Sequence, residues 1–304
     1  MIEFRKVDLS TGVTLNVALA GAADGPPVIL LHGFPESHRT WREIVPLLED
    51  RFRLIMPDQR GFAGSDMPQD VAEYESDKLI NDIFALADAL HVESFALVGH
   101  DWGGAIAWGV ALRGEPRLTR LAIVNAPHPA IFQKSLMEDS DQRAASQYIN
   151  MFRMPGAVAA IEAMGLETFF EKVLASHADR SKISEPEKQQ YLADWSQPGA
   201  LTAMLNWYRA SSLVVPPPGI TVPLPDMLLH FAKRITIPTL VVWGMADSAL
   251  LPAQLDGLDK VVDNLTIVRL PGVSHFAPWE APEQVAAALA PFLAGVPAAT
   301  APAA

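Results

Sequence analysis

The chain of 304 residues has no cysteine, a deficit of basic residues and no long apolar run. Without cysteine it forms no disulfide, uses no thiol nucleophile and builds no cysteine-based metal site. The 23 Lys and Arg residues against 35 Asp and Glu give a net charge of −12, which disfavours binding to nucleic acid and anionic membranes. No stretch approaches the ~18 apolar residues of a membrane-spanning helix. We therefore expect no nucleic-acid partner, no membrane insertion, and neither a metal nor a cofactor.

The beginning of the chain (residues 1–6) lacks the hydrophobic core of a signal peptide, so we expect a mature, cytoplasmic protein. Half of the residues are hydrophobic and the mean hydropathy is +0.16. A chain of this length can bury roughly three quarters of its unfolded surface, which is enough for a large core.

Short apolar runs bounded by Gly, Pro or Asp predict buried strands, and helix-like stretches lie between them. This alternation predicts an α/β fold with a mostly parallel central sheet and helices on both faces. Strands are expected at 28–31, 53–56, 95–98, 121–124, 239–243 and 266–270, with strand-like alternation at 13–19. Helices are expected at 41–48, 78–90, 102–113 and 282–293.

The alternation stops between about residues 127 and 230. Helix-like patches there predict a helical cap, or lid, over the carboxyl edge of the sheet, where open α/β sheets place their sites. These patches are 142–153, 165–176, 185–195 and 199–210. The sequence thus predicts a core in two parts (1–127 and 231–304), a cap at 128–230 and a low-complexity tail at 295–304. Caps of this kind often contribute to dimer contacts, so a homodimer is one expected assembly.

The pentad Gly-His-Asp-Trp-Gly at residues 99–103 directly follows an apolar run. It has the spacing of a nucleophile elbow, in which a strand turns sharply into a helix and glycines flank the nucleophile. Serine is the usual central residue, but here it is Asp101. A carboxylate displaces a leaving group at saturated carbon and forms an ester that water must cleave. This favours chemistry on carbon–oxygen or carbon–halogen bonds.

Two further candidates follow the last two predicted strands of the sheet. Asp247 and His275 lie in loops that should open at the same edge as the elbow. The order nucleophile, acid, histidine is that of the α/β-hydrolases. We expect His275 to activate water against the ester, and Asp247 to orient the imidazole and stabilise its charged form.

The turn after the strand at 28–31 has the sequence His-Gly-Phe-Pro. Here the backbone N–H of Phe34, together with that of Trp102, can hold the oxygen of the ester carbonyl. The alternative is a plain strand-to-helix turn. His32 is expected to support the loop, His100 to pack beside the elbow, and Asp58 with Arg60 to form a loop ion pair.

The chain has only four tyrosines, and two of them, Tyr148 and Tyr208, fall on predicted cap helices. A phenol is protonated at neutral pH and can donate to an oxygen that develops negative charge. The alternative is an amphipathic tyrosine that packs with its hydroxyl in water. For the substrate we expect contacts with Trp102, Met151 and Phe34, and an apolar pocket to which Met154, Met204 and Phe169 also contribute.

Over nearly its whole length the chain resembles the α/β-hydrolase-fold epoxide hydrolases. The matching pieces are residues 32–35, 58–61, 99–104 and 125–129 and the segments around Tyr148 and Tyr208. The resemblance implies a small apolar epoxide as substrate and a vicinal diol as product. It also implies that Tyr148 and Tyr208 activate the epoxide oxygen, with Asp101 as nucleophile, His275 as base and Asp247 as acid.

Two other functions stay open at this point. Haloalkane and haloacetate dehalogenases resemble the same plan and share the aspartate elbow, and Trp102 could hold a halide. However, Phe34 stands where haloalkane dehalogenases often have Asn, and Trp102 where fluoroacetate dehalogenases have Arg. The other alternative is a ligand-binding sensor on the same fold, which would need no complete triad.

Overall fold

The computed structural model describes residues 2–220 and 233–295 and has one central sheet. Its strands are β1 (Glu3–Asp8), β2 (Thr14–Gly21), β3 (Pro27–Leu31), β4 (Arg53–Pro57), β5 (Phe95–His100), β6 (Leu118–Val124), β7 (Thr239–Gly244) and β8 (Leu265–Leu270). They are ordered β1-β2-β4-β3-β5-β6-β7-β8. β2 pairs with β1 and β4 in antiparallel fashion, and all other neighbouring strands are parallel to each other. The predicted fold class is confirmed.

All seven predicted strands are present, but the edge strand β1 was not expected. Five of its six residues are exposed and only Val7 is buried, so its sequence lacks the alternation of a half-buried strand. By contrast, every residue of β5 is buried. Its neighbouring side chains enter different core clusters on the two faces of the sheet: Leu97 enters one, and Ala96 and Val98 the other.

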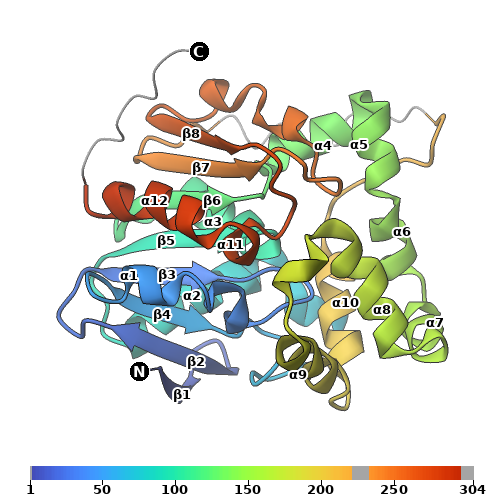
Figure 1. Cartoon of the computed structure of the whole chain (residues 1–304), viewed down its shortest axis with the longest axis horizontal. Helices are drawn as coiled ribbons and strands as arrows, with labels where there is room; N and C mark the ends of the chain where they lie inside the picture. The colour runs from blue at the N-terminus through green and yellow to red at the C-terminus, as the bar shows by residue number, and fades with distance from the viewer. Residues whose placement is uncertain (1, 221–232, 296–304) are drawn as a thin grey trace.

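Helices of the core cover both faces of the sheet (Figure 1). They are α1 (Val45–Leu48), α2 (Ser76–Ala89), α3 (Trp102–Arg113), α11 (Ala277–Glu280) and α12 (Pro282–Leu293). The predicted helix at 41–48 is wrong in its first half, because the 3-10 turn η1 (His38–Trp41) ends at Trp41 and residues 42–44 form a turn before α1. Pro46 lies in the first turn of α1, where its missing N–H is tolerated, and it disfavours an earlier helix start.

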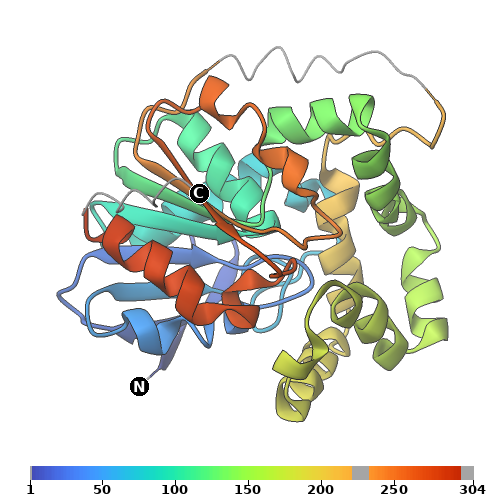
Figure 2. The same ribbon diagram turned by 45° about the horizontal axis from the view of Figure 1, so that its top comes forward.

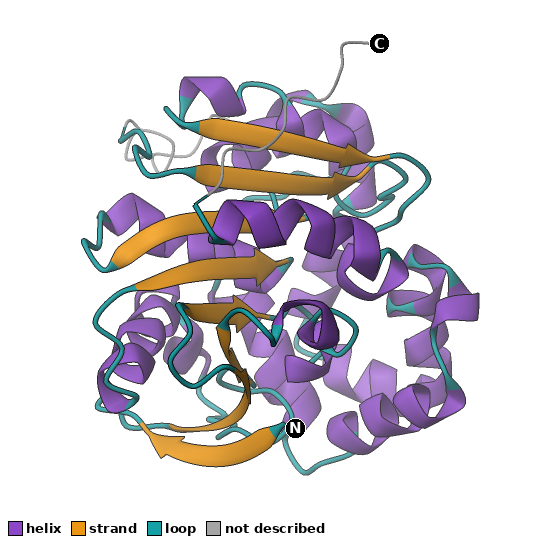
Figure 3. Ribbon diagram, turned by 60° about the vertical axis from the view of Figure 1, so that its left-hand side comes forward, coloured by secondary structure: helices purple, strands orange, loops and turns teal. Residues whose placement is uncertain are grey.

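A group of helices joins β6 to β7 and lies beyond the ends of the parallel strands (Figures 2 and 3). It consists of α4 (Pro129–Glu138), α5 (Ser140–Ala145), α6 (Gln147–Arg153), α7 (Ala157–Met164), α8 (Leu166–Val173), η3 (Ala175–His177), η4 (Arg180–Lys182), α9 (Glu185–Trp195) and α10 (Ala200–Ala210). We call the described part of this insertion the cap. The strand arrows in Figure 3 point toward it, so the cap faces the carboxyl edge of the sheet.

The predicted cap helices at 185–195 and 199–210 are confirmed, whereas α4 and α7 were not expected. The predicted helix at 142–153 is interrupted at Ser146, whose buried hydroxyl accepts a hydrogen bond from Gln142. The division into core and cap at residues 127/128 and 230/231 stays a prediction. Residues 221–232 lie outside the described part, as does all of the predicted tail except Gly295. No described helix is long and apolar enough to cross a membrane.

Candidate active site

Asp101 lies at the tip of a tight turn between β5 and α3. Its backbone has φ 50° and ψ −122°, a conformation that few non-glycine residues adopt. A Cβ on Gly99 would lie 2.4 Å from the carbonyl oxygen of Gly103, and one on Gly103 would lie 2.4 Å from that of Leu31. Glycine at positions 99 and 103 therefore allows β5, α3 and the end of β3 to approach closely. The tight turn that results presents the Asp101 carboxylate at its tip.

The structure brings Asp101, His275 and Asp247 together from three separate strand ends. The Nε2 atom of His275 lies 3.6 Å from Oδ2 of Asp101, and its Nδ1 atom lies 2.8 Å from Oδ2 of Asp247. Asp247 is 3% exposed, and its Oδ1 accepts hydrogen bonds from the amides of Ala249 and Leu250, both at 2.9 Å. The acid is thus held on one side by its own loop and presents the other oxygen to the imidazole.

The electrostatics of this group favour a charged pair in the free protein. Burial acts to raise the pKa of Asp101, but the hydrogen bond and charge of His275 outweigh it and hold that pKa below its usual value. Burial acts to lower the pKa of His275, yet Asp247 and then Asp101 raise it well above the usual value. The imidazole therefore carries a proton while the Asp101 carboxylate is ionised.

Two backbone amides hydrogen-bond the Asp101 carboxylate, and one of them binds the oxygen that does not face His275. The N–H of Phe34 donates to Oδ1 at 2.7 Å, and the N–H of Trp102 also hydrogen-bonds this carboxylate. A Cβ on Gly33 would lie 2.4 Å from Oδ1, so only glycine leaves room for the turn to approach. The Phe34 amide is thus aimed at the oxygen that would become the ester carbonyl, and the Trp102 amide lies within reach of the same carboxylate.

Tyr148 on α6 and Tyr208 on α10 face each other over the same carboxylate. Their ring centroids are 6.0 Å apart, with an interplanar angle of 83°. Burial raises the pKa of both phenols, and the Asp101 charge raises each of them further. A hydrogen bond from the Trp102 side chain acts in the opposite direction on Tyr208. Both side chains therefore stay protonated and can donate a hydrogen bond.

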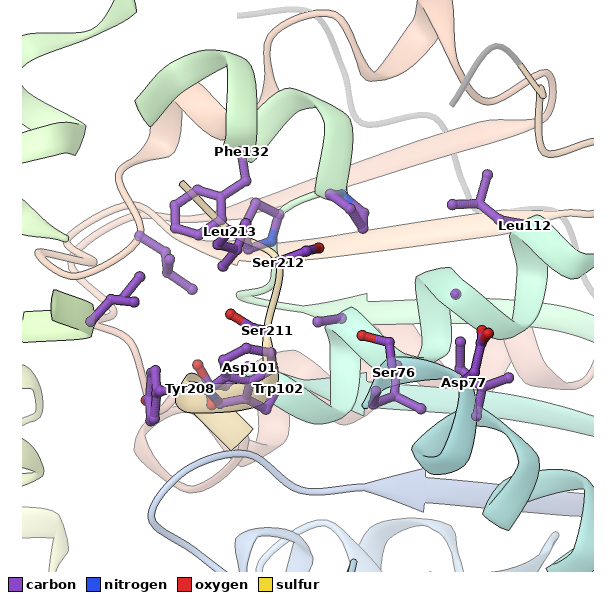
Figure 4. Close-up of a pocket in the computed structure, with 18 of the residues that line it drawn as sticks. Ser76, Asp77, Asp101, Trp102, Leu112, Phe132, Tyr208, Ser211, Ser212 and Leu213 are labelled. Atoms are coloured by element: carbon purple, nitrogen blue, oxygen red, sulfur yellow. The ribbon is translucent and has the colours of Figure 1, made fainter. Parts of the chain in front are cut away.

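Two cavities meet at Asp101, Tyr148 and Tyr208, which line both of them. The first, the α2–α3 arm, has a volume of about 420 Å³ and extends past Ile106 to Ser76 and Asp77. Figure 4 shows Asp101, Trp102 and Tyr208 at one end of it and Ser76 and Asp77 at the other. The second, the cap arm, has about 310 Å³. Its lining includes Phe34, Met151, Phe152, Ala157, Met164, Phe169, His177 and His275.

Of the predicted substrate contacts, Trp102 lines the α2–α3 arm, and Phe34, Met151 and Phe169 line the cap arm. Met151 does so with a side chain that is 58% exposed. The expectation for the two other methionines is wrong. Met154 is 59% exposed and lines neither arm, and Met204, a residue of the same helix as Tyr208, is buried in the core and lines neither arm.

The predicted ion pair between Asp58 and Arg60 is also wrong, because the two side chains point to different partners. Asp58 accepts from the His38 ring at 2.7 Å and from Asn16 at 2.8 Å. Arg60 donates twice to Asp82, each time at 2.8 Å. Both arrangements brace the loop after β4 and neither reaches the cavity.

The two other histidines near the turn have buried, structural surroundings. Burial lowers the pKa of His32 to about 4, and its ring bridges the Gly33 carbonyl and the Gln59 amide, which supports the loop as predicted. Burial likewise lowers the pKa of His100 to about 4. The Nε2 atom of His100 lies 2.9 Å from the backbone carbonyl of His275, so it braces the histidine loop in addition to packing beside the elbow.

Sequence reasoning missed two buried polar residues around the triad. Asn125, at the end of β6, donates to Asp247 at 2.7 Å and accepts from the amide of Gly244, so it joins the acid to the end of β7. The sequence around Asn125 does not predict its positive φ of 43°. Glu36 is 2% exposed and accepts from Tyr191, which lies on the cap helix α9. A partner 155 positions away gives no local signal.

The cap also contacts the histidine loop through the segment after α8. The amide of His275 donates to the His177 carbonyl at 3.3 Å. The Glu280 carboxylate accepts from the amide of Ser274 at 3.1 Å and from that of Asp179. Hydrogen bonds from both sides thus hold the backbone of the predicted base between core and cap.

The chain matches known proteins over most of its length. Residues 26–282 match the family model described as alpha/beta hydrolase fold. The AB hydrolase superfamily protein YfhM of Bacillus subtilis (strain 168) is 33% identical over 274 residues, which cover 90% of this chain and 92% of that protein. Epoxide hydrolase 3 of Xenopus tropicalis is 30% identical over 93% of this chain and 75% of that protein.

A solved structure gives a still higher identity. It is described as one of the "Novel epoxide hydrolases belonging to the alpha/beta hydrolases superfamily in metagenomes from hot environments". It superposes with a TM-score of 0.85 at 51% identity and covers 97% of this chain and 99% of that one. The chain therefore belongs to the α/β-hydrolase-fold family and, within it, to the group that includes the epoxide hydrolases.

Proposed function

We propose that this chain is an epoxide hydrolase that converts a small apolar epoxide to a vicinal diol through an ester of Asp101. The observation that carries the proposal is the meeting of three groups at one point of the cavity. These are a carboxylate on a nucleophile elbow, a histidine–acid pair behind it and two protonated phenols opposite it. Relatives named epoxide hydrolases support the same reaction.

In the first half-reaction Tyr148 and Tyr208 donate to the epoxide oxygen, and Asp101 attacks one of the ring carbons. Oδ2 is the attacking atom, because Oδ1 is occupied by the Phe34 amide. A new bond forms between Oδ2 and carbon, the carbon–oxygen bond of the epoxide breaks, and a phenol protonates the alkoxide. The product is a hydroxyalkyl ester of Asp101.

In the second half-reaction water attacks the carbonyl carbon of this ester. Esterification removes the Asp101 charge, which is one of the two anions that raise the pKa of His275. The imidazole therefore loses its proton more readily and becomes the base that deprotonates the water. The amides of Phe34 and Trp102 hold the oxyanion at Oδ1, and the bond between the carbonyl carbon and Oδ2 breaks. The proton that the imidazole gave up on esterification restores the phenol. One proton of the water stays on His275, the other passes to the departing oxygen, and the diol leaves.

Diol formation from terminal and aryl epoxides tests the reaction, with Asp101→Ala protein as the blank. We expect diol only with the unaltered chain. The His275→Gln protein should accumulate the ester, which adds the mass of the epoxide to the intact protein. An unmodified protein after incubation with a substrate that the unaltered chain converts would contradict the ester mechanism.

Dehalogenation is the second candidate, since the same triad could displace halide. A free indole N–H next to the nucleophile would favour it, but the Trp102 side chain hydrogen-bonds Tyr208 here. The phenols suit an alkoxide that stays attached to the substrate. Halide release from haloalkanes or haloacetates, without diol formation from any epoxide, would reverse the assignment. Slow turnover with tightly retained product would instead support a sensor.

The division into core and cap, the homodimer and the cytoplasmic location are further parts of this proposal. The cap role is supported by its place over the strand ends and by its supply of both phenols. Sedimentation analysis of the purified chain measures the assembly, and a mass near the 33.0 kDa of one chain would contradict the dimer.

A further inference from the structure

Arg153 is the last residue of α6, the helix that carries Tyr148. Its guanidinium hydrogen-bonds the end of α10, the helix that carries Tyr208, and the residues that follow it. Nε donates to the carbonyl of Tyr208 itself at 2.9 Å. Nη2 donates to the carbonyl and the hydroxyl of Ser211 at 3.0 and 2.7 Å, and Nη1 to the carbonyl of Leu213 at 2.7 Å. One side chain thus makes four hydrogen bonds across the gap between the two tyrosine helices.

The acceptors lie in the last turn of α10 and in the segment directly after it. Among the described residues, the Tyr208 carbonyl has lost the donor of a continuing helix and accepts, besides Arg153, only the Ser211 amide at 3.3 Å, and a basic side chain can satisfy such carbonyls. The rigid fork of a guanidinium reaches several such oxygens at once, which a lysine ammonium cannot do. Arg153 therefore fixes both the position and the direction of the α10 end relative to α6.

This cation has only neutral oxygens around it in the hydrogen bonds that the structure describes. Its described hydrogen bonds all go to carbonyl or hydroxyl oxygens and none to a carboxylate, and burial lowers the pKa of its guanidinium. A half-buried charge costs desolvation free energy that an ion pair would partly return. An apolar side chain could join two helices without that cost, so packing alone does not account for an arginine here.

Aromatic contacts connect the helix end that Arg153 holds with the rings of the two phenols. Phe152, the neighbour of Arg153 on α6, lies 5.0 Å from the Tyr208 ring and 5.8 Å from the Tyr148 ring, centroid to centroid. A shift of α10 along α6 would separate the two hydroxyls, although each must reach the same substrate oxygen. Misplacement of a reacting group by about 1 Å can cost on the order of 100-fold in rate.

We infer that Arg153 is a positioning residue that sets both phenols against one epoxide oxygen. The inference rests on the proposed function. It assigns Arg153 to the first half-reaction alone, because His275 and Asp247, which act in the second, lie on core loops to which none of its described hydrogen bonds goes.

The test measures the two half-reactions separately in Arg153→Gln and Arg153→Lys proteins. Ester formation is followed by quenching and intact mass spectrometry in the His275→Gln background, where the ester accumulates. Ester decay is followed after removal of substrate in chains with His275. We expect Arg153→Gln to slow formation by about 10- to 100-fold, with decay changed less than about threefold. Arg153→Lys keeps the charge and most of the bulk, so it should fold and show an intermediate loss.

Arg143 offers a matched control within the cap. Its guanidinium also donates to carbonyls at a helix end, those of Leu136 and Met137 in α4, but it holds neither tyrosine helix end in this way. Arg143→Gln should lower the melting temperature as much as Arg153→Gln or more, with both half-reactions unchanged. Equal slowing of formation in the two proteins would overturn the inference and leave only a structural role.

A Tyr208→Phe background adds a second control. If Arg153 acts through the phenols, its replacement should slow ester formation less in this background than in the unaltered chain. A fully additive loss, or slowing of both half-reactions alike, would overturn the inference. Failure of the proposed function gives a different result, since no ester would then form in the His275→Gln protein even with Arg153 present.

Discussion

The two oxygens of the Asp101 carboxylate have different surroundings, and this difference gives each one a separate task. Oδ1 accepts a hydrogen bond from the Phe34 amide, and Oδ2 faces His275. A serine hydroxyl has a single oxygen, so a serine at this turn would leave the amides free for a substrate carbonyl. With aspartate the Phe34 amide already binds the oxygen that would become the carbonyl oxygen of the proposed ester. The residue at position 101 thus decides whether the oxyanion forms on the substrate or on the protein.

Removal of the phenols should affect only the first half-reaction. We expect Tyr208→Phe to slow ester formation by roughly 10- to 100-fold, and loss of both hydroxyls to slow it by about 10⁴-fold. The alkoxide would then have to leave without a proton donor. Rapid-quench mass spectrometry measures the rate, and Tyr74→Phe is the control, because that buried hydroxyl bonds the Pro68 carbonyl away from the cavity. Unchanged rates in the double variant would remove the phenols from the mechanism.

The pKa shifts predict different pH dependences for the two half-reactions. The phenol pKa values are raised, so Tyr148 and Tyr208 keep their protons as pH rises past the usual ~10. The pKa of Asp101 is lowered, so the nucleophile stays ionised as pH falls to the usual ~4. Ester formation should therefore vary little between these limits.

Ester hydrolysis needs neutral His275, whose pKa is raised by Asp247 and Asp101. Its rate should fall as pH decreases through the pKa of the imidazole in the ester, where only Asp247 still raises that value. The ester should then accumulate during turnover at about pH 5 and be scarce at about pH 8. The fraction of modified protein at steady state measures this, and a fraction that does not change with pH would contradict the assignment of His275 as base.

Several residue-level predictions failed for a common physical reason. Asp58 and Arg60 are close in sequence but point to partners on other elements, and Met204 belongs to the buried side of its helix. Periodicity locates a helix but does not fix which face meets a cavity when both faces are buried. By contrast, the meeting of Asp101, Asp247 and His275 was predictable because each lies in the turn or loop that follows a predicted strand of the parallel sheet.

At the scale of elements, the contact between α3 and the strand ends depends on glycine. A Cβ on Gly103 would lie 2.4 Å from the carbonyl oxygens of Leu31 and His32, which the backbone cannot move aside cheaply. We expect Gly103→Ala to lower the free energy of unfolding by roughly 1–3 kcal/mol. Denaturant unfolding measures the change.

Gly156 provides the matched control, since it has a negative φ of −89° and no atom within 4 Å of an added Cβ. Gly156→Ala should leave stability unchanged or raise it by about 0.5 kcal/mol. If the two variants had the same stability, close approach at the elbow would not be what the glycine provides.

The elements of the cap were harder to predict than those of the sheet. The strands stand out as apolar runs between Gly, Pro and Asp, whereas α5 and α6 are separated only by Ser146, a residue that helices tolerate. The helix α7 has apolar residues on most of its surface, and its sequence does not show the face that packs. Helix boundaries in the cap depend on contacts with partners far along the chain, which a local pattern does not contain.

At the scale of the whole molecule, the nucleophile lies where two cavities join, so a substrate can extend to both sides of it. We expect trans-4,5-epoxyoctane, with one apolar group for each arm, to be converted at least as efficiently as its isomer 1,2-epoxyoctane. The values of kcat/KM for the two isomers measure this preference. A clear preference for the terminal isomer would show that only one arm accepts substrate.

Variants that narrow one of the two cavity arms at a time provide the control for this preference. Ala105 lines the α2–α3 arm and Ala157 the cap arm. Ala105→Leu and Ala157→Leu should each lower kcat/KM for the internal epoxide by about tenfold or more. At most one of them should affect the terminal isomer. Equal losses for both isomers in both variants would indicate a general disturbance of the site.

The hydrogen bond from His275 to the His177 carbonyl, with the Glu280 bridge beside it, bears on how this molecule can be redesigned. The inserted helices are not an interchangeable module that only shapes the cavity, because their backbone also holds the loop of His275, the proposed base. A chimera that receives another protein's insertion must therefore reproduce the path of the main chain at residues 177–179. Otherwise a graft chosen for a new substrate would bind it, become alkylated and stall.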